Sequence, residues 1–279
     1  MKSSALTMKT LATLLATAAL GSAQAGTLYI GGWNTGTVYS VDLTAQTVTP
    51  LVGGFSQISG MEGIGNDLYV FTQSDDVITQ IDPTTGATLT TYNLGALGIN
   101  VTGEGTFAMH SNLTGFTSSS SGSVGTYYTF DLNANTATNI GTGISFDGVD
   151  YAPNGILYGL TQSPTTPGGS ELRIIDPTTG STQLVGSTGI SSSALAGLVV
   201  ADGDFIAAIG SSLYRIDPFT AAPTFLFDPG IGDISGAAFL GSTNPGENPN
   251  PNPMPEPMSL ALLGLGLAGL GASRRLSKK

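Results

Sequence analysis

The sequence predicts an all-β protein, a five-bladed propeller with four-stranded blades, and three observations carry this prediction. The first is composition: 40 of 279 residues are Gly and only 10% are charged, while β-branched residues, Ser and Thr are abundant, which favours strands and turns over helices. The second is a sequence repeat with a period of 40–49 residues. The third is a lone strand after the last repeat, which would close a ring and remove its open edges.

The repeat is marked by a short hydrophobic strand that ends in Asp. These residues are spaced by 40, 49, 45 and 41 positions, and they are Asp42, Asp82, Asp131, Asp176 and Asp217. Residues 82–86 and 176–180 both read Asp-Pro-Thr-Thr-Gly. In such a turn Asp caps the backbone, Pro presets φ, and Gly takes the left-handed position. We therefore assign these Asp residues a structural role.

Each unit contains, in order, a Gly-containing strand, a Leu-Tyr strand, the Asp-ended strand and a Thr-rich strand. The Gly strand is expected nearest the axis, where Gly permits close packing of neighbouring blades. The third unit is the least regular, and we place its Gly strand near residues 101–105. The first unit begins at Leu28 without a Gly strand, whereas residues 234–239 form one that has no unit of its own. We expect this strand to complete the first blade.

The repeat resembles that of five-bladed propellers of the NHL and YVTN style, and the likeness concerns architecture alone. The alternative architecture is a β-sandwich. The predicted body spans residues 26–241.

The first 25 residues read as a signal peptide. Lys2 and Lys9 provide a positive start, residues 11–20 form a short apolar run, and residues 23–25 form a small-x-small site with cleavage expected after Ala25. The alternative is an N-terminal membrane anchor, for which the apolar run is short.

The C-terminal segment has three parts. Residues 242–257 form a Pro-rich linker, which favours an extended conformation. An uncharged run over residues 258–272 predicts a transmembrane-type helix, and the basic residues after it favour a cytoplasmic C-terminus. An ordinary membrane tail and a sorting signal both fit this composition.

The motif Pro255-Glu256-Pro257, the apolar run, and the pair Arg274-Arg275 together resemble the PEP-CTERM sorting domain. The resemblance covers about 25 residues. It implies a Gram-negative bacterium, export across the inner membrane, and recognition by an exosortase. The protein would then reside at the cell surface or in an exopolysaccharide or biofilm matrix, with transient or permanent anchoring by the C-terminal helix. Leu276-Ser277 interrupts the usual basic run. The resemblance does not extend to the body.

Without the two end segments, residues 26–257 carry two Arg, no Lys and nineteen acidic residues, a net charge of −17. Such a surface repels phosphate backbones and anionic lipids, so the sequence argues against nucleic-acid binding. The absence of Cys excludes disulfides and thiol catalysis. Because no catalytic constellation is evident, we expect the body to act by binding, with exopolysaccharide or another surface component as partner. A secreted glycan- or lactone-hydrolysing enzyme and a calcium-dependent adhesive module are the alternatives.

The connections between strands sort onto two faces. One face carries the Asp turns and the short links at Asn66 and Asn154. The other carries the links between Leu-Tyr and Asp-ended strands, among which we count long links at residues 110–126 and 161–170. Loops on a rigid scaffold are the usual location of binding residues, so we expect a ligand on this second face. Its candidate residues are Trp33, Asp75, Asp76, His110, Asp228 and Asp233.

Two of these candidates have competing interpretations. His110, the single His of the chain, is either a general acid or base or a loop residue bonded to a backbone carbonyl. Trp33 either stacks on a sugar ring or packs within the first blade. In both cases we favour the structural interpretation.

Several acidic residues also have two interpretations. The pair Asp75-Asp76 and the run Asp202-Gly203-Asp204 offer hard oxygen ligands for calcium, but neither has the spacing of a calcium loop. Glu62 and Glu104 lie in or near Gly strands, and a carboxylate pair at the channel could serve glycoside hydrolysis. We favour solvated turns for the first group and no catalytic role for the second. Residues 118–123 are expected to form a flexible loop tip.

Overall fold

The structure is a computed structural model that describes residues 26–241, except 102, 104, 122, 162–168, 191–195, 202 and the side chains of 120 and 121. The predicted signal peptide, linker and sorting tail lie outside the described residues. Within the described part of the chain, no helix has the length and apolar character that a membrane crossing requires.

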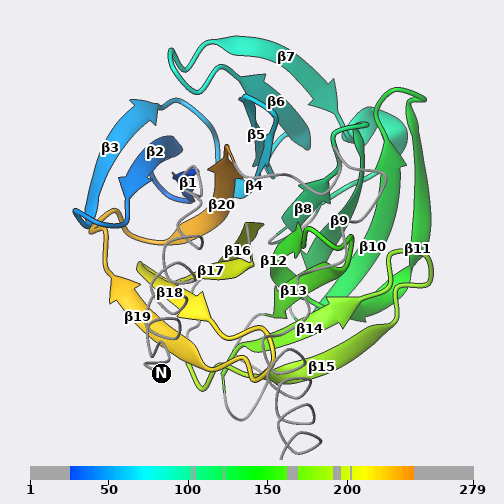
Figure 1. Ribbon diagram of the computed structural model, residues 1–279. Coiled ribbons are helices and arrows are strands. Elements are labelled where there is room, and N and C mark those ends of the chain that lie inside the picture. The colour runs from blue at the N-terminus through cyan, green and yellow to red at the C-terminus, as the bar shows by residue number, and fades with distance from the viewer. Residues whose placement is uncertain are drawn as a thin grey trace, which may run out of the picture.

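Five four-stranded antiparallel sheets surround a central axis, as predicted, and Figure 1 views them along that axis. We number these blades along the chain and give their strands from the axis outward. Blade 1 contains β20 (Ile234–Leu240), β1 (Thr27–Gly32), β2 (Thr37–Asp42) and β3 (Thr47–Val52). Blade 2 contains β4 (Ile58–Ile64), β5 (Asp67–Thr72), β6 (Val77–Ile81) and β7 (Thr88–Asn93).

The remaining blades follow the same order, and a short 3-10 helix (Gly95–Leu97) connects blade 2 to blade 3. Blade 3 contains β8 (Gly105–Met109), β9 (Thr114–Ser121), β10 (Val124–Asp131) and β11 (Thr136–Ile144). Blade 4 contains β12 (Phe146–Tyr151), β13 (Leu157–Thr161), β14 (Glu171–Ile175) and β15 (Thr182–Ser187). Blade 5 contains β16 (Ala196–Ala201), β17 (Asp204–Ile209), β18 (Ser212–Ile216) and β19 (Pro223–Phe227).

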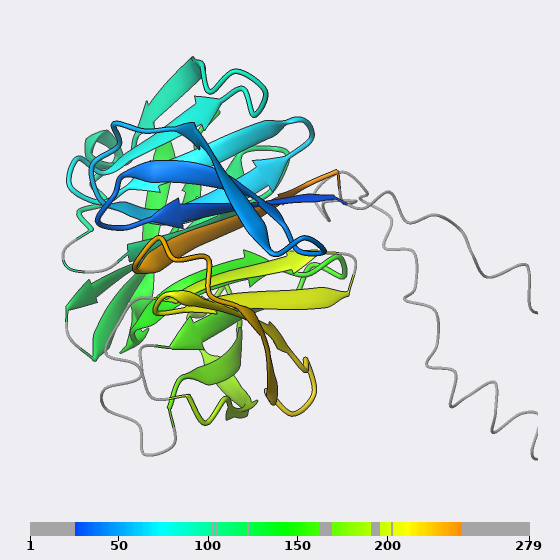
Figure 2. The ribbon, with the colours of Figure 1, turned by 90° about the vertical axis from the view of Figure 1, so that its left-hand side faces the viewer.

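The ring is closed by β20, as the lone Gly strand predicts. β20 pairs with β1 in antiparallel register, with Leu28 opposite Phe239, and Figure 2 shows the two strands running side by side through the body. The Ser235 hydroxyl donates a hydrogen bond to the Ile58 carbonyl on the inner strand of blade 2. The first and last strands of the body therefore share one blade, and that blade is tied to its neighbour.

Glycines let the inner strands approach closely at one level of the axis. The axial space at this level measures about 150 Å³, has no room for a water molecule, and is lined by Gly60, Thr106, Gly148, Gly197, Gly236 and their neighbours. A Cβ atom on Gly148 would lie 2.5 Å from the backbone nitrogen of Leu198 in the next blade. The predicted role of the Gly strands is confirmed, and the channel is closed at this level.

Blade 3 differs from its prediction. Its inner strand is β8, at Gly105–Met109 rather than residues 101–105, and β9 occupies much of the predicted long link over residues 110–126. Within the predicted flexible tip at residues 118–123, Ser118 and Ser119 are instead buried in β9. The predicted inner strand of blade 3 was misplaced because Thr106 stands at the level where the other inner strands have Gly. Its hydroxyl accepts a hydrogen bond from the Val149 N–H (3.2 Å).

The links lie on two faces, which we call the Asp-turn face and the loop face. The Asp-turn face holds the β2–β3, β6–β7, β10–β11, β14–β15 and β18–β19 turns, whereas the loop face holds the links that enter the inner strands. Each turn Asp accepts hydrogen bonds from backbone N–H groups within the turn; for Asp42 these are the Thr44 and Ala45 N–H groups, both at 2.8 Å. The structural role predicted for these residues is confirmed.

The Asp176 carboxylate accepts more hydrogen bonds than the carboxylates of the other turn Asp residues. Hydrogen bonds from the Thr178 and Thr179 hydroxyls, with the Thr178 backbone N–H, lower the pKa of Asp176 to about 2. We expect Asp176→Ala to lower the melting temperature by several degrees, because the turn N–H and hydroxyl groups lose their acceptor. Asp176→Asn keeps one acceptor oxygen and should lose less. Thermal unfolding followed by circular dichroism would measure both, and equal losses would contradict the assignment.

Candidate functional site

A pair of buried carboxylates lies near the axis, toward the Asp-turn face. Glu62 extends from β4 and Asp150 from β12, and their side chains are hydrogen-bonded to each other. Glu62 also accepts hydrogen bonds from the N–H groups of Gly63 (3.1 Å) and Met109 (3.2 Å). Asp150 accepts from the N–H groups of Tyr151 (2.7 Å) and Val200 (2.5 Å). The pair therefore connects the inner strands of blades 2, 3, 4 and 5.

The environment of this pair favours protonated carboxyl groups. Burial raises the pKa of Glu62 well above its usual range, and the charge of Asp150 raises it further. Burial also raises the pKa of Asp150 to about 7, against the opposing effect of the Val200 and Tyr151 N–H groups. In the arrangement that these shifts favour, a neutral Glu62 donates its proton to the Asp150 carboxylate. Two carboxyl groups so close in a buried site do not both ionise readily.

Tyr151 and His110 lie beside the pair. Their rings stack with centroids 3.9 Å apart and planes at 33°. Burial lowers the pKa of His110, and burial with the nearby charges of Glu62 and Asp150 raises the pKa of Tyr151. His110 follows β8 directly, so it lies on the Asp-turn face and not on the loop face where we expected it. The sequence predicted a loop over most of β9. Because β9 is a strand, β8 is the innermost strand of blade 3, and the link after β8 lies on the Asp-turn face.

The carboxylate pair considered from the sequence, and not favoured, was Glu62 with Glu104, and Glu104 lies outside the described residues. The partner that the structure shows is Asp150, a residue that the sequence reasoning missed. Glycosidases hold their carboxylates about 5–9.5 Å apart around a substrate, whereas Glu62 and Asp150 hydrogen-bond directly and are each 6% exposed. The pair thus ties strands together and presents no surface to a sugar. The repeated pattern Gly-x-acid, at Gly60 and Gly148, is the sequence signal that could have found it.

The other five candidate residues lie on the loop face, as predicted. Trp33 is half-buried in the β1–β2 link, and its backbone N–H donates to the carbonyl of Asp233 in the β19–β20 link (3.0 Å). Asp228, in the same link, accepts from the Ser211 hydroxyl (2.9 Å) and the Gly230 N–H (2.8 Å). These contacts join the β1–β2 and β19–β20 links and stabilise the second of them.

Asp75 and Asp76 lie in the β5–β6 link and stabilise it by hydrogen bonds. Asp75 accepts from the Thr72 hydroxyl (2.5 Å), and Asp76 accepts from the Val101 N–H (3.0 Å) while partial burial raises the pKa of Asp76. On the Asp-turn face, Asp204 pairs with Arg215 at 3.2 Å, and Asp202 lies outside the described residues. Among the residues that the structure describes, no three His, Asp or Glu side chains gather as a metal site would require. The calcium hypothesis has no ligand set within this part of the chain.

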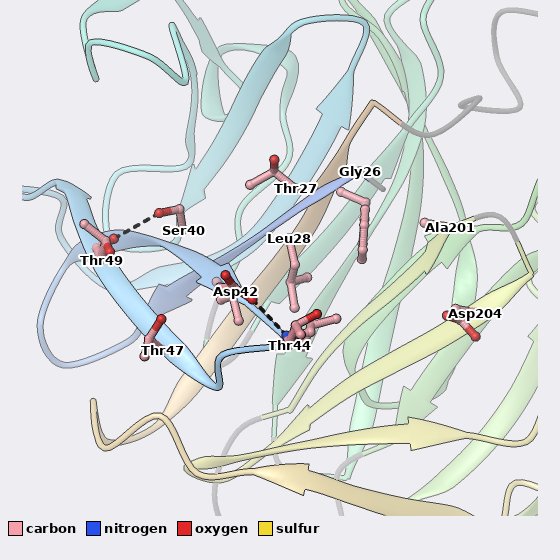
Figure 3. A pocket seen from close by; sticks show the side chains of 13 residues that line it. Gly26, Thr27, Leu28, Ser40, Asp42, Thr44, Thr47, Thr49, Ala201 and Asp204 are labelled. Carbon is pink, nitrogen blue, oxygen red and sulfur yellow. Dashed lines mark hydrogen bonds between the residues drawn. The ribbon is translucent and has the colours of Figure 1, made fainter. Parts of the chain in front are cut away.

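The Asp-turn face has a cleft between blades 1 and 5, which sequence reasoning did not predict. The cleft measures about 680 Å³, and Figure 3 shows Asp42 of blade 1 and Asp204 of blade 5 on opposite sides of it. Its polar lining comprises Thr27, Ser40, Asp42, Thr44, Thr47, Thr49 and Asp204. Its apolar lining comprises Leu28, Val41, Leu43, Ala201 and Phe239. Hydroxyl and carboxylate groups thus surround an apolar surface, next to Gly26, where the body begins.

Comparison with known proteins gives a likeness in fold. No protein-family model matches the chain, and neither does any curated protein. A chain in the crystal structure of a nidogen/laminin complex is similar over 77% of this chain and 98% of its own length, with a TM-score of 0.51 and 12% identity. TolB from Acinetobacter baumannii is similar over 73% of this chain and 52% of its own length, with a TM-score of 0.45 and 14% identity. At 12% identity, the first of these likenesses shows the fold alone.

Proposed function

We propose that this chain is an exported, exosortase-sorted protein of the cell surface or biofilm matrix, and that its propeller acts by binding rather than by catalysis. The proposal of export and sorting rests on the signal-like first 25 residues and on the motif Pro255-Glu256-Pro257 with Arg274-Arg275. Binding rests on one observation, the cleft between blades 1 and 5, whose walls offer hydrogen-bonding groups without a nucleophile and its base. The structurally similar nidogen/laminin chain also belongs to a complex.

The cleft favours a neutral, polyhydroxylated ligand. Asp42 and Asp204 accept hydrogen bonds from hydroxyl groups, the Thr and Ser side chains both donate and accept, and Phe239 with Leu43 offers an apolar surface to C–H groups. Anionic ligands are disfavoured, because residues 26–257 have no Lys and a net charge of −17. A neutral exopolysaccharide of the matrix fits this chemistry.

Sorting is tested by intact mass. We expect the protein from cell-surface and secreted fractions to end near Pro255-Glu256-Pro257 when the exosortase is present, and to keep its full C-terminus when the exosortase gene is deleted. A full-length C-terminus in both strains would contradict the sorting proposal and indicate a plain membrane anchor.

Binding is tested by filling the cleft. Thr49 is exposed and lines the cleft, so we expect Thr49→Trp to weaken binding to matrix polysaccharide at least about tenfold by obstructing the site. Thr90→Trp is the matched control, because Thr90 has the corresponding exposed position on β7 and lies outside the cleft lining. Equal affinity of the two variants, measured by calorimetry with the isolated polysaccharide, would exclude this cleft as the site.

A further inference from the structure

The hydrogen bonds of Glu62 and Asp150 join blades that are distant in sequence. Glu62 of blade 2 accepts from the Met109 N–H of blade 3, and Asp150 of blade 4 accepts from the Val200 N–H of blade 5. The bond between the two carboxyl groups then crosses the axis and links the halves. Both side chains are 6% exposed, so solvent does not compensate for a broken bond.

The pair holds together through one proton. With a proton on Glu62, its carboxyl group donates to the Asp150 carboxylate, and the pair carries a single negative charge. When that proton passes to solvent, two carboxylates remain with no donor between them. Like charges at hydrogen-bonding distance in a buried site repel strongly, and each is left with its backbone N–H donors alone.

Few other ionisable groups surround the pair. The inner strands β8, β16 and β20 carry none among their residues, whereas β12 carries a second buried carboxyl group, Asp147. The other titratable neighbours are His110 after β8, Tyr151 on β12, Tyr69 opposite Glu62 on β5, and Tyr158 opposite Asp150 on β13. Burial raises the pKa of each of these tyrosines above its ordinary value near 10 and lowers the pKa of His110. No Lys or Arg lies on these strands to neutralise a second negative charge.

We propose that Glu62 and Asp150 form a proton-dependent lock that holds blades 2 to 5 together at the axis and opens in alkaline solution. The inference does not depend on the proposed function. The direction in which stability changes with pH follows from the difference in proton binding between the folded and unfolded chain. Unfolded Glu62 and Asp150 lose their protons near pH 4, whereas the folded pair keeps protons to about pH 7 and above. Stability contributed by the pair is therefore present in acid and is lost as pH rises through the folded pKa.

The test compares the purified full chain with Glu62→Gln between pH 7 and pH 9, where His110 no longer titrates. We expect the melting temperature of the natural protein to fall by about 5–10 °C over this range. Gln has nearly the shape of the protonated acid and donates to Asp150 without a titrating proton, but its amide nitrogen replaces one of the two oxygens that accept from the Gly63 and Met109 N–H groups. We therefore expect Glu62→Gln to be less stable than the natural protein in acid and to lose most of this pH dependence. A merely structural role for Glu62 would make the variant less stable by the same amount at every pH.

Asp75→Asn serves as the matched control, because Asp75 is an exposed acid on the loop face and its substitution should leave the pH dependence unchanged. Carbon NMR of the natural protein provides a readout that requires no variant. We expect one Glu carboxyl carbon to titrate well above the usual Glu range and one Asp carboxyl carbon near pH 7, with faster amide exchange at Met109 and Val200, relative to other strand amides, as these groups lose their protons. Parallel melting curves for natural protein and Glu62→Gln, or titration of every carboxyl carbon below pH 6, would overturn the proposal.

Discussion

A chain that ends after Asp233 should fail to form the native ring. This truncation removes β20, the inner strand of blade 1, whose side chains are buried at every position except Phe239. β1 then loses its hydrogen-bonded partner, and its five buried residues become exposed along an open edge. We expect a loss that exceeds the whole net stability of a typical domain, about 5–15 kcal/mol. Circular dichroism should show no cooperative thermal transition, and size-exclusion chromatography should show expansion or aggregation.

The matched control ends eight residues later, at Gly241, and keeps all twenty strands of the described body. We expect this control to unfold cooperatively. A synthetic peptide of residues 234–241 added to the shorter chain should restore part of the transition, whereas a scrambled peptide should not. If the shorter chain melts at the temperature of the control, the ring does not depend on closure by β20.

The outer parts of the blades were predictable because their signals are local. Asp, Pro and Gly at fixed positions determine turns such as those at residues 82–86 and 176–180, whatever surrounds them. The spacing of those turns then gives the number of blades, and the lone strand at residues 234–239 gives the closure. The arrangement of links on two faces follows from the alternation of strand direction, which is why Trp33 and Asp75 were assigned to the correct face.

Blade 3 was misread because its signals are not local. Thr106 replaces the expected Gly, and Ser118 lies in a Ser-rich segment that has the composition of an exposed loop. These residues form buried strands because neighbouring blades provide hydrogen-bond partners, such as the Val149 N–H for Thr106. A single sequence does not reveal such contacts, and the error moved His110 to the wrong face.

The carboxylate pair and the cleft depend on the closed ring. Glu62 and Asp150 are 88 residues apart, on blades that are not adjacent, so their contact exists only once the inner strands surround the axis. Asp42 and Asp204 line opposite sides of the cleft at the junction of the first and last blades. Pairings across a ring follow from its size and curvature, which a repeat period alone does not determine.

Gly148→Ala should be among the most destabilising single substitutions in the body. The new Cβ would lie 2.5 Å from the backbone nitrogen of Leu198 and 2.7 Å from the carbonyl carbon of Gly197. Both atoms belong to the backbone of β16, which is fixed by its pairing with β17, so neither can move without shifting the inner strand of blade 5. We expect a loss of about 2–4 kcal/mol, or roughly 5–15 °C in melting temperature.

Gly197→Ala is the matched control at the same level of the axis. Its nearest atom would lie at 3.3 Å, a contact that a shift of a few tenths of an ångström relieves, so we expect a loss below about 1 kcal/mol. Neither glycine has a positive φ, so backbone strain does not separate the two variants. Equal losses in thermal unfolding would contradict the close-approach argument.

The same substitution should also affect the proton-dependent lock. Asp150 and Val200 lie two residues beyond Gly148 and Leu198 on the same two strands, and the Val200 N–H donates to Asp150. A shift of β16 away from β12 would lengthen that bond, remove a donor that stabilises the Asp150 carboxylate, and raise the pKa of Asp150 further. We therefore expect the decline in stability of Gly148→Ala with rising pH to continue to a higher pH than that of Gly197→Ala. Melting curves of both variants between pH 6 and pH 9 would show this displacement.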